Sequence, residues 1–255
     1  MSRARLTVVG CAGSFAGPDS AASCYLLEAD HEGRRWRVLI DIGSGAVGPL
    51  QRFVDPLTLD AVLLSHLHPD HYFDISGLFV LWKYHPDGAC GRIPIWGPKG
   101  TAAQVVRAYG LSPKSGMDSE FDFREYDGRP VELGPFTVHT TRVAHPVTAY
   151  AMRIEVGGKV LAYSGDTGPC GQLLDVARDA DLLLCEAAFL EGNDNPPDLH
   201  LTGRQAAEAA RDAGARALVL THIPAWHDKQ RALAEAQAVF DGPLELAATG
   251  ATYEL

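Results

Sequence analysis

The sequence predicts an α/β fold from three observations. Short apolar segments with strand character alternate with helical segments along the chain. Hydrophobic residues make up 46% of the 255 residues and charged residues 21%, a globular composition that excludes disordered, collagen-like and coiled-coil chains. No linker-like or low-complexity run divides the sequence. We therefore expect one domain that spans residues 1–255.

The strand candidates are segments rich in β-branched and aliphatic residues. In chain order they cover residues 6–9, 24–28, 37–42, 61–65, 136–143, 150–156, 160–164, 182–185 and 217–221. The helix candidates cover residues 75–84, 101–109, 170–177, 203–213 and 227–240. The fourth helix has the clearest ends, because Thr202 suits an N-cap and Gly214 suits a C-terminal stop. The Pro- and Gly-rich stretch 83–120 is expected to form an excursion beside the core.

Charge and cysteine content narrow the class of protein. The chain has 22 Lys and Arg against 32 Asp and Glu, a formal charge of −10, which disfavours a long nucleic acid as partner. No apolar run approaches the ~18–20 residues of a membrane helix, and the N-terminus lacks the apolar segment of a secretion signal. The five cysteines are odd in number and form no Cys-x-x-Cys, which indicates reduced thiols and a cytoplasmic protein. A homodimer is compatible with these observations.

Two parts of the chain share a weak pattern. In the first part a predicted strand leads to Asp41, a helix follows, and a second predicted strand ends at Ser65. In the second part the corresponding residues are Asp166 and Glu186. The pattern suggests two similar halves that meet at a shared site.

The segment His66-Leu67-His68-Pro69-Asp70-His71 is the strongest chemical signal in the chain, because it places four potential metal ligands within six residues. The alternative, a polar loop with a chance cluster, would bring together imidazoles that repel one another when protonated. Neutral imidazole and carboxylate suit Zn²⁺, Mn²⁺ or Fe²⁺. His66 and His68 can converge on one ion, while Asp70 and His71 face a second.

Three further residues lie where predicted strands end, which is where ligands gather in α/β proteins. They are His145, Asp166 and His222. Each alone is as consistent with an ordinary loop residue. Together with the first cluster they predict a metal centre.

These residues, in this order and spacing, resemble the five-motif signature of the metallo-β-lactamase superfamily from about Leu6 to the end of the chain. The resemblance implies a four-layer αβ/βα sandwich of two similar halves, with the site at one edge. It implies two divalent metal ions, with zinc expected and manganese or iron as alternatives. The first ion would be held by His66, His68 and His145, the second by Asp70, His71 and His222, and Asp166 would bridge them. One departure is Asp74, where the family often has a glycine, and it concerns local helix packing.

Further motifs resemble particular branches of this superfamily. The string Gly165-Asp166-Thr167-Gly168 resembles the phosphodiesterase branch, whereas true β-lactamases carry Cys or His at the bridging position. Cys185-Glu186-Ala187-Ala188 and His200-Leu201-Thr202 are similar to the His-Glu-Ala-Thr and His-Ser-Thr elements of the tRNA 3′-end endonucleases (tRNase Z). The long tRNA-gripping arm of those enzymes is missing, since only 20 residues separate His145 from Asp166.

The closer resemblance is to the small cyclic-nucleotide phosphodiesterases of actinobacterial type, in strings such as Leu220-Thr221-His222-Ile223-Pro224. It implies hydrolysis of 3′,5′-cyclic AMP or another small phosphodiester. Two divalent ions ~3.5–4 Å apart can lower the pKa of a bridging water, and we expect the resulting hydroxide to attack phosphorus. The expected catalytic residues are Asp70, which orients the nucleophile, His200, which protonates the leaving oxygen, and Glu186, which orients His200.

Substrate contacts and competing functions stay open at this level. Trp226 can stack on a nucleobase, an interaction worth ~1–3 kcal/mol, or pack in the core, and Tyr72 has the same two interpretations. Asp41 can support a ligand histidine or cap a strand end. The segment Gly10–Ser14 lacks the ending of a nucleotide-binding loop, which leaves a close backbone approach to the site. The alternative functions are a tRNase Z-like endonuclease without the arm and a non-catalytic regulatory protein that binds metal or nucleotide.

Overall fold

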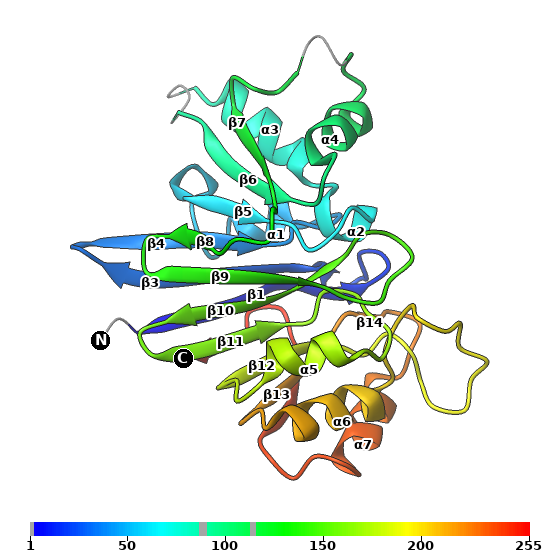
Figure 1. The fold of residues 1–255 in the computed structure, drawn as a ribbon. Coiled ribbons are helices and arrows are strands. Elements are labelled where there is room, and N and C mark those ends of the chain that lie inside the picture. The colour runs from blue at the N-terminus through cyan, green and yellow to red at the C-terminus, as the bar shows by residue number, and fades with distance from the viewer. Residues whose placement is uncertain (1–2, 87–90, 113–115) are drawn as a thin grey trace.

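The computed structural model describes residues 3–86, 91–112 and 116–255. In this part of the chain two sheets lie face to face, with helices on both outer faces (Figure 1). The first sheet has the order β14-β1-β3-β4-β5-β6-β7, with β2 and β16 also paired to β1. The second has the order β15-β13-β12-β11-β10-β9-β8. The arrangement is the predicted four-layer αβ/βα sandwich.

The strands of the first sheet are β1 (Ala4–Gly13), β2 (Ala21–Ala22), β3 (Cys24–His31), β4 (Arg34–Ile40), β5 (Ala61–Leu63), β6 (Ile93–Gly97), β7 (Phe121–Glu125), β14 (Ile223–Pro224) and β16 (Thr252–Glu254). Those of the second are β8 (Val131–Leu133), β9 (Phe136–Arg142), β10 (Tyr150–Val156), β11 (Lys159–Tyr163), β12 (Leu182–Glu186), β13 (Leu218–Thr221) and β15 (Leu244–Leu246). The helices are α1 (Val47–Leu50), α2 (Pro69–Tyr72), α3 (Ile75–Tyr84), α4 (Thr101–Tyr109), α5 (Gly171–Ala177), α6 (Gly203–Ala213) and α7 (Lys229–Gln237), with a short 3₁₀ turn at Pro56–Thr58.

Three hydrophobic clusters separate the four layers, because strand residues alternate between the two faces of each sheet. Leu27 of β3 and Val38 of β4 belong to the cluster between the sheets, whereas their neighbours Leu26 and Leu39 face the cluster under α3 and α4. The third cluster lies between the second sheet and α5, α6 and α7. Each sheet is therefore buried on both faces, as its near-continuous apolar strands predict.

Most predicted elements appear, with shifted ends. Thr202 caps α6 in a reciprocal capping box with Gln205, and Gly214 ends the helix in the left-handed region at φ 71°, as predicted. The helix predicted at 170–177 begins one residue later, and that predicted at 227–240 is the shorter α7, capped by Asp228.

The expectation for residues 83–120 is wrong in part. Strand β6 lies within this stretch and pairs with both β5 and β7, so it belongs to the first sheet. Its sequence, Ile-Pro-Ile-Trp-Gly, hides the strand because Pro and Gly disfavour sheet interiors. The side chains of Ile93 and Ile95 are nonetheless fully buried under α3 and α4.

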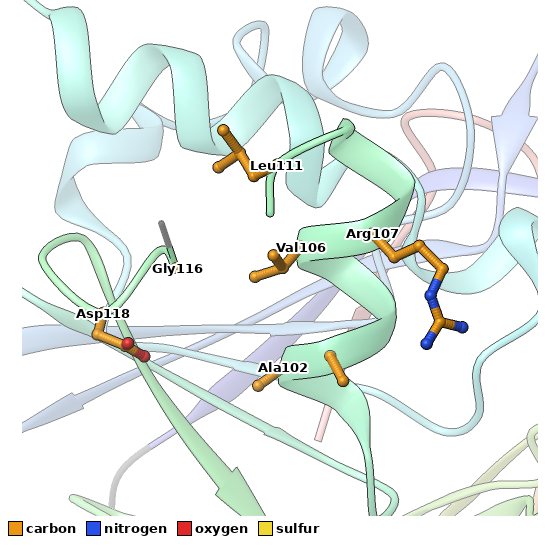
Figure 2. A pocket seen from close by; sticks show the side chains of 7 residues that line it. Ala102, Val106, Arg107, Leu111, Gly116 and Asp118 are labelled. Atoms are coloured by element: carbon orange, nitrogen blue, oxygen red, sulfur yellow. The ribbon is translucent and has the colours of Figure 1, made fainter. Parts of the chain in front are cut away.

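A hollow of about 310 Å³ lies beside α4 in the same region (Figure 2). It is lined by Ala102, Ala103, Val106, Arg107, Leu111, Gly116 and Asp118. None of the predicted site residues borders it, so the predicted chemistry lies elsewhere. Within the described residues, no helix has the length and apolar character needed to cross a membrane.

The fold brings the predicted site residues together at one edge of the two sheets. The parallel strands β4, β5, β11, β12 and β13 all end toward this edge. The residues at or just beyond these ends are Asp41, Ser65, Asp166, Glu186 and His222. Parallel strands thus deliver polar side chains from both halves to a common site.

Candidate metal centre

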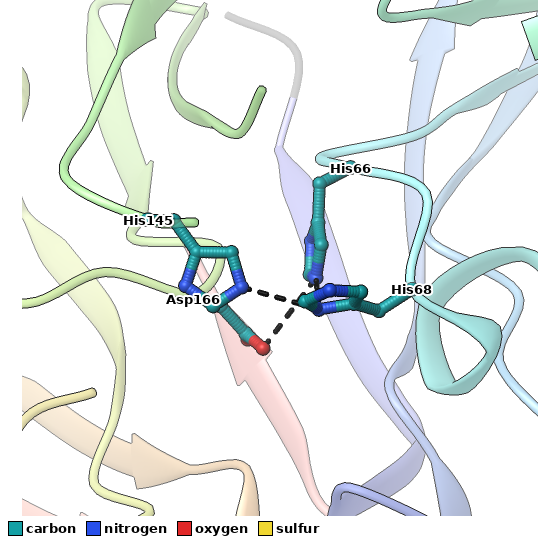
Figure 3. A group of neighbouring side chains, drawn as sticks. All are labelled: His66, His68, His145 and Asp166. Atoms are coloured by element: carbon teal, nitrogen blue, oxygen red, sulfur yellow. Dashed lines mark hydrogen bonds and ion pairs between the residues drawn. The ribbon is translucent and has the colours of Figure 1, made fainter. Parts of the chain in front are cut away.

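One group of donors lies at the junction of the two halves (Figure 3). His66 and His68 come from the loop after β5, His145 from the loop between β9 and β10, and Asp166 from the loop after β11. One ligand atom from each lies within 4.8 Å of all the others. His68 Nδ1 is 3.1 Å from both His66 Nε2 and His145 Nε2, and Asp166 Oδ2 is 3.5 Å from His66 Nε2.

A second group shares Asp166 with the first. It consists of Asp70, His71, Asp166 and His222, all buried. His222 Nε2 lies 3.1 Å from His71 Nε2 and 3.0 Å from Asp70 Oδ2. Asp166 Oδ1 lies 3.2 Å from His71 Nε2. The two groups therefore contain the seven predicted metal ligands, divided as the family resemblance implies.

The donor set fits two divalent cations. Imidazole nitrogens that lie 3.1 Å apart repel through their lone pairs unless a proton or a cation lies between them. Asp166 Oδ1 is buried and forms no hydrogen bond, although two imidazole nitrogens lie within 3.4 Å of it. A buried carboxylate oxygen without a hydrogen bond is costly, and a cation relieves that cost. Five imidazoles in two such clusters, together with the carboxylates of Asp70 and Asp166, are ligands typical of zinc, manganese and iron.

The electrostatics of the site favour deprotonated ligands at the first group. Burial lowers the pKa of His66 well below its usual value, and neighbouring histidines lower it further. Burial also lowers the pKa of His68 and His145. These three side chains are therefore neutral and can ligate metal without first losing a proton.

The second group holds a proton in the metal-free protein. Burial lowers the pKa of His71, but Asp166 and Asp41 on either side outweigh it and raise that pKa well above its usual value. Burial raises the pKa of Asp70, but the hydrogen bond from His222 and the charge of His71 outweigh it and keep the carboxyl ionised. Metal binding at this group is therefore expected to release a proton.

Asp41 holds the ring of His71 through a hydrogen bond to its Nδ1. Its Oδ2 accepts hydrogen bonds from His71 Nδ1, Ser65 Oγ and Tyr163 Oη, each at 2.7 Å, and its Oδ1 accepts one from the Ser65 amide at 2.7 Å. This network assigns the Nδ1 proton of His71 and leaves Nε2 directed at the donor group. Of the two interpretations of Asp41, support of a ligand histidine is the one the structure has. Sequence analysis missed Tyr163, because its partner lies 122 positions away.

Glu186 and His200 form a second buried pair beside the donors. Glu186 Oε1 accepts hydrogen bonds from His200 Nδ1 at 2.9 Å and from the Thr167 amide at 2.7 Å. Its Oε2 accepts two longer bonds from backbone amides. Glu186, His200 and His222 also satisfy the distance criterion for a metal group. Because four donors already occupy the Glu186 carboxylate, it orients His200 rather than holding an ion.

His200 lies between the donor groups and a loop wall. Its ring centroid is 5.4 Å from that of His222 and 5.0 Å from that of Phe189. Burial lowers the pKa of His200, but the charge and hydrogen bond of Glu186 outweigh it and raise the pKa to about 9. Phe189 is a neighbour that sequence analysis missed, and no motif indicates it.

The two predicted substrate contacts have different surroundings. Trp226 is 64% exposed, so it does not pack in the core, and its ring lies 4.9 Å from that of the exposed Phe15. The expectation for Tyr72 needs correction. Its ring is buried in the cluster under α3 and α4, and its hydroxyl accepts a hydrogen bond from Gln104. A buried ring offers no face for stacking on a ligand.

The backbone of β1 approaches the site closely at Gly13. A Cβ at this position would lie 2.2 Å from the carbonyl oxygen of His222. The amide of His222 donates a hydrogen bond to the carbonyl of Cys11. This is the close approach expected for the segment Gly10–Ser14, and it fixes the backbone of a metal donor.

Comparison with known proteins agrees with this geometry. Residues 36–223 match the family model described as the Beta-lactamase superfamily domain. The chain belongs to this superfamily, and its sandwich of two sheets is the metallo-β-lactamase fold.

Individual relatives within this superfamily match most of the chain. The chain is 44% identical to the uncharacterized protein Rv1339 of Mycobacterium tuberculosis, over 98% of this chain and 92% of that protein. It is 33% identical to the probable metallo-hydrolase YhfI of Bacillus subtilis, over 98% and 99%. The crystal structure of YhfI superposes with a TM-score of 0.88 at 30% identity, covering 99% of this chain and 100% of that one. Ribonuclease Z of Myxococcus xanthus is 30% identical over 86% and 88%. The predicted membership, fold and resemblance to tRNase Z are confirmed.

Proposed function

We propose that this metallo-hydrolase is a dinuclear phosphodiesterase that hydrolyses a small phosphodiester, with 3′,5′-cyclic AMP or another cyclic nucleotide as the expected substrate. The observation that carries the proposal is the position of Asp166, which belongs to both donor groups, with His200 next to it. Two metal positions and one oriented acid are the parts that phosphodiester hydrolysis needs.

The ligands divide between two cations, for which zinc is expected and manganese and iron are the alternatives. One cation would be held by His66, His68 and His145, the other by Asp70, His71 and His222, and Asp166 would contact both. When bound, such a pair supplies positive charge for the phosphate and makes water reactive at neutral pH.

The side chains around the cations have separate tasks. Because Glu186 accepts the Nδ1 proton of His200, Nε2 is free to donate a proton to the leaving ester oxygen. Glu186 is a positioning residue, since it contacts His200 and backbone amides. Asp70 is hydrogen-bonded to His222 Nε2 and would also orient the attacking water.

Three observations favour a small substrate over a folded RNA. The chain carries a net charge of −10, which opposes binding of a polyanion. Strands β10 and β11 and their Gly157-Gly158 turn fill the interval between His145 and Asp166, which leaves no length for an arm. The exposed pair Phe15 and Trp226 offers an aromatic surface for a base.

The four cysteines that the structure describes are free, which supports a cytoplasmic location.

An RNA 3′-end endonuclease is the second candidate, because a ribonuclease Z is among the relatives at 30% identity. A non-catalytic protein that binds metal or nucleotide is the third.

The test is incubation of metal-loaded protein with cyclic AMP, cyclic GMP, precursor tRNA and bis(p-nitrophenyl) phosphate, combined with elemental analysis. We expect about two metal ions per chain and rapid hydrolysis of a cyclic nucleotide. Cleavage of precursor tRNA alone would support the endonuclease, and no hydrolysis of any phosphodiester would support the binding protein.

A further inference from the structure

A hollow of about 450 Å³ lies beside the metal donors, and His200, whose ring is 5.4 Å from that of His222, is one of its lining residues. It is within the size range of ligand pockets, roughly 300–1,000 Å³. Its walls include Pro169, Phe189, Glu191, Asn193, Asp198 and His200. We call it the 189–200 hollow after the segment that supplies most of its lining.

The 189–200 hollow is attached firmly to the metal centre. A Cβ on Gly168, two positions after Asp166, would lie 2.5 Å from the Cα of Asp198, so the two loops are in direct backbone contact. Phe189 packs edge-on against His200, with ring planes at 89°. On the opposite wall Thr202 donates a hydrogen bond to Glu191 at 2.7 Å. The hollow is therefore a formed feature of this part of the fold.

The 189–200 hollow lies where the group that carries the leaving oxygen is expected. In hydrolysis of a phosphodiester, water adds to phosphorus, the bond from phosphorus to the leaving oxygen breaks, and that oxygen takes a proton. A proton donor must lie within hydrogen-bond distance of the leaving oxygen. In a cyclic nucleotide the leaving oxygen stays on the sugar, which remains bound to phosphorus through its other ester oxygen. If His200 is the donor, that sugar lies beside His200, next to the space that His200 itself lines.

The lining is polar and carries negative charge. Two carboxylates, Glu191 and Asp198, line the hollow, and residues 189–200 contain no Lys or Arg. Arg204 lies 4.0 Å from Glu191 and offsets part of its charge. Asp198 forms no ion pair or side-chain hydrogen bond within the described residues, and it is held at a left-handed φ of 54° at the wall of the hollow. Asn193 adds an amide that both donates and accepts hydrogen bonds.

We propose that the 189–200 hollow receives the neutral sugar on the leaving-oxygen side of a cyclic nucleotide, and that Asp198 selects against substrates with a second anion there. The inference rests on the proposed function and assigns a substrate class to its site. Phe189 gives the sugar an apolar wall, and the Asn193 amide and the carboxylates of Glu191 and Asp198 match the hydroxyl donors of the sugar. An added anion meets the unpaired charge of Asp198.

The test compares two derivatives of 3′,5′-cyclic AMP with chains of equal length on the 2′ oxygen, 2′-O-butyryl, which is neutral, and 2′-O-succinyl, which adds a carboxylate. For the metal-loaded wild type we expect kcat/KM to be about fivefold higher for the butyryl derivative, from repulsion between like charges in a partly exposed site. Asp198→Asn is expected to bring the two values to within about twofold, mainly through KM. The matched control is Asp194→Asn, which removes the same charge from the same loop outside the lining and is expected to keep the wild-type ratio.

The possible outcomes separate the two proposals. Hydrolysis of cyclic AMP with equal kcat/KM for both derivatives, or equal effects of the Asp198 and Asp194 variants, would overturn the assignment of the hollow and leave the proposed activity intact. Failure to hydrolyse both cyclic AMP and cyclic GMP would overturn the cyclic-nucleotide activity and this inference with it.

Discussion

At the scale of single residues, the proposed mechanism assigns proton transfer to the pair of Glu186 and His200 and metal binding to other side chains. The ring of His200 lies next to the donors, and its Nδ1 is hydrogen-bonded to Glu186, whereas its Nε2 forms no hydrogen bond within the described residues. A side chain in this position can act on the substrate while the seven ligands hold the metal ions. This separation can be measured.

Replacement of His200 by Ala is expected to lower kcat by about 10²–10⁴-fold, the range for loss of a general acid. The seven proposed ligands remain, so the metal content should stay near that of the wild type. Steady-state kinetics and elemental analysis on the same preparation provide the check. Loss of both metal ions, or an unchanged rate, would show that His200 has another role.

The pH dependence of stability reports the same pair in the metal-free protein. The pKa of His200 is raised from 6.5 to about 9 by Glu186. A group whose pKa is higher in the folded state stabilises that state fully below its unfolded pKa, and the stabilisation is lost as the pH rises through the folded pKa. The difference in the free energy of unfolding between wild type and His200→Gln should therefore shrink from pH 6.5 to above pH 9. Urea titrations in chelator at several pH values measure it, and a constant difference would contradict the assignment.

The sequence predicted the donors better than their supports. The seven proposed metal ligands carry a signal together, because the cluster at residues 66–71 and three further His and Asp residues at strand ends predict one metal centre. Tyr163, which holds Asp41, and Phe189, which packs on His200, carry no such signal. A tyrosine or phenylalanine at the end of an apolar segment has the same local pattern whether it packs in a core or contacts a site.

At the scale of elements, the first strand does more than pair within its sheet. The predicted strand 6–9 is part of the longer β1, whose last residue, Gly13, touches the backbone of His222. Apolar periodicity indicates a strand but gives neither its ends nor its contacts with distant segments. For the same reason the pattern did not reveal β6, where Pro94 interrupts a buried strand that pairs on both sides.

Replacement of Gly13 by Ala tests this contact. The new Cβ would require β1 or the His222 segment to shift, because the nearest atom is a backbone oxygen at 2.2 Å. We expect the metal affinity to fall by about 10–100-fold, as for other changes that displace a ligand. Gly48→Ala is the control, since a Cβ there meets no atom within 4 Å. Equal metal affinities in titrations of the two variants would show that the contact does not position His222.

At the scale of the whole molecule, each donor group takes side chains from both halves. In the first group, His66 and His68 follow a strand of one sheet, while His145 and Asp166 follow strands of the other. The weak internal repeat in the sequence suggested two halves with a shared site. The docking of the two sheets could not be read from it, because the cluster between them is formed by contacts distant in sequence.

Removal of metal is expected to lower the thermal stability of the entire chain. A ligand that binds only the folded state adds about 4 kcal/mol at a thousandfold excess over its Kd, which corresponds to a fall in Tm of about 10 °C for a chain of this size. Calorimetry with and without chelator measures the change, and added zinc should restore the original Tm. An unchanged Tm would mean that the donors hold no ion tightly.

The shared position of Asp166 has a wider consequence. Asp166 comes from one half of the molecule, whereas its neighbours Asp70 and His71 in the second group come from the other half. An ion bound there would therefore oppose separation of the sheets by heat, denaturant or mechanical force. Protein synthesised while metal is scarce would be degraded faster than protein loaded at once. The supply of metal would then set the lifetime of the chain in the cell as well as its catalytic rate.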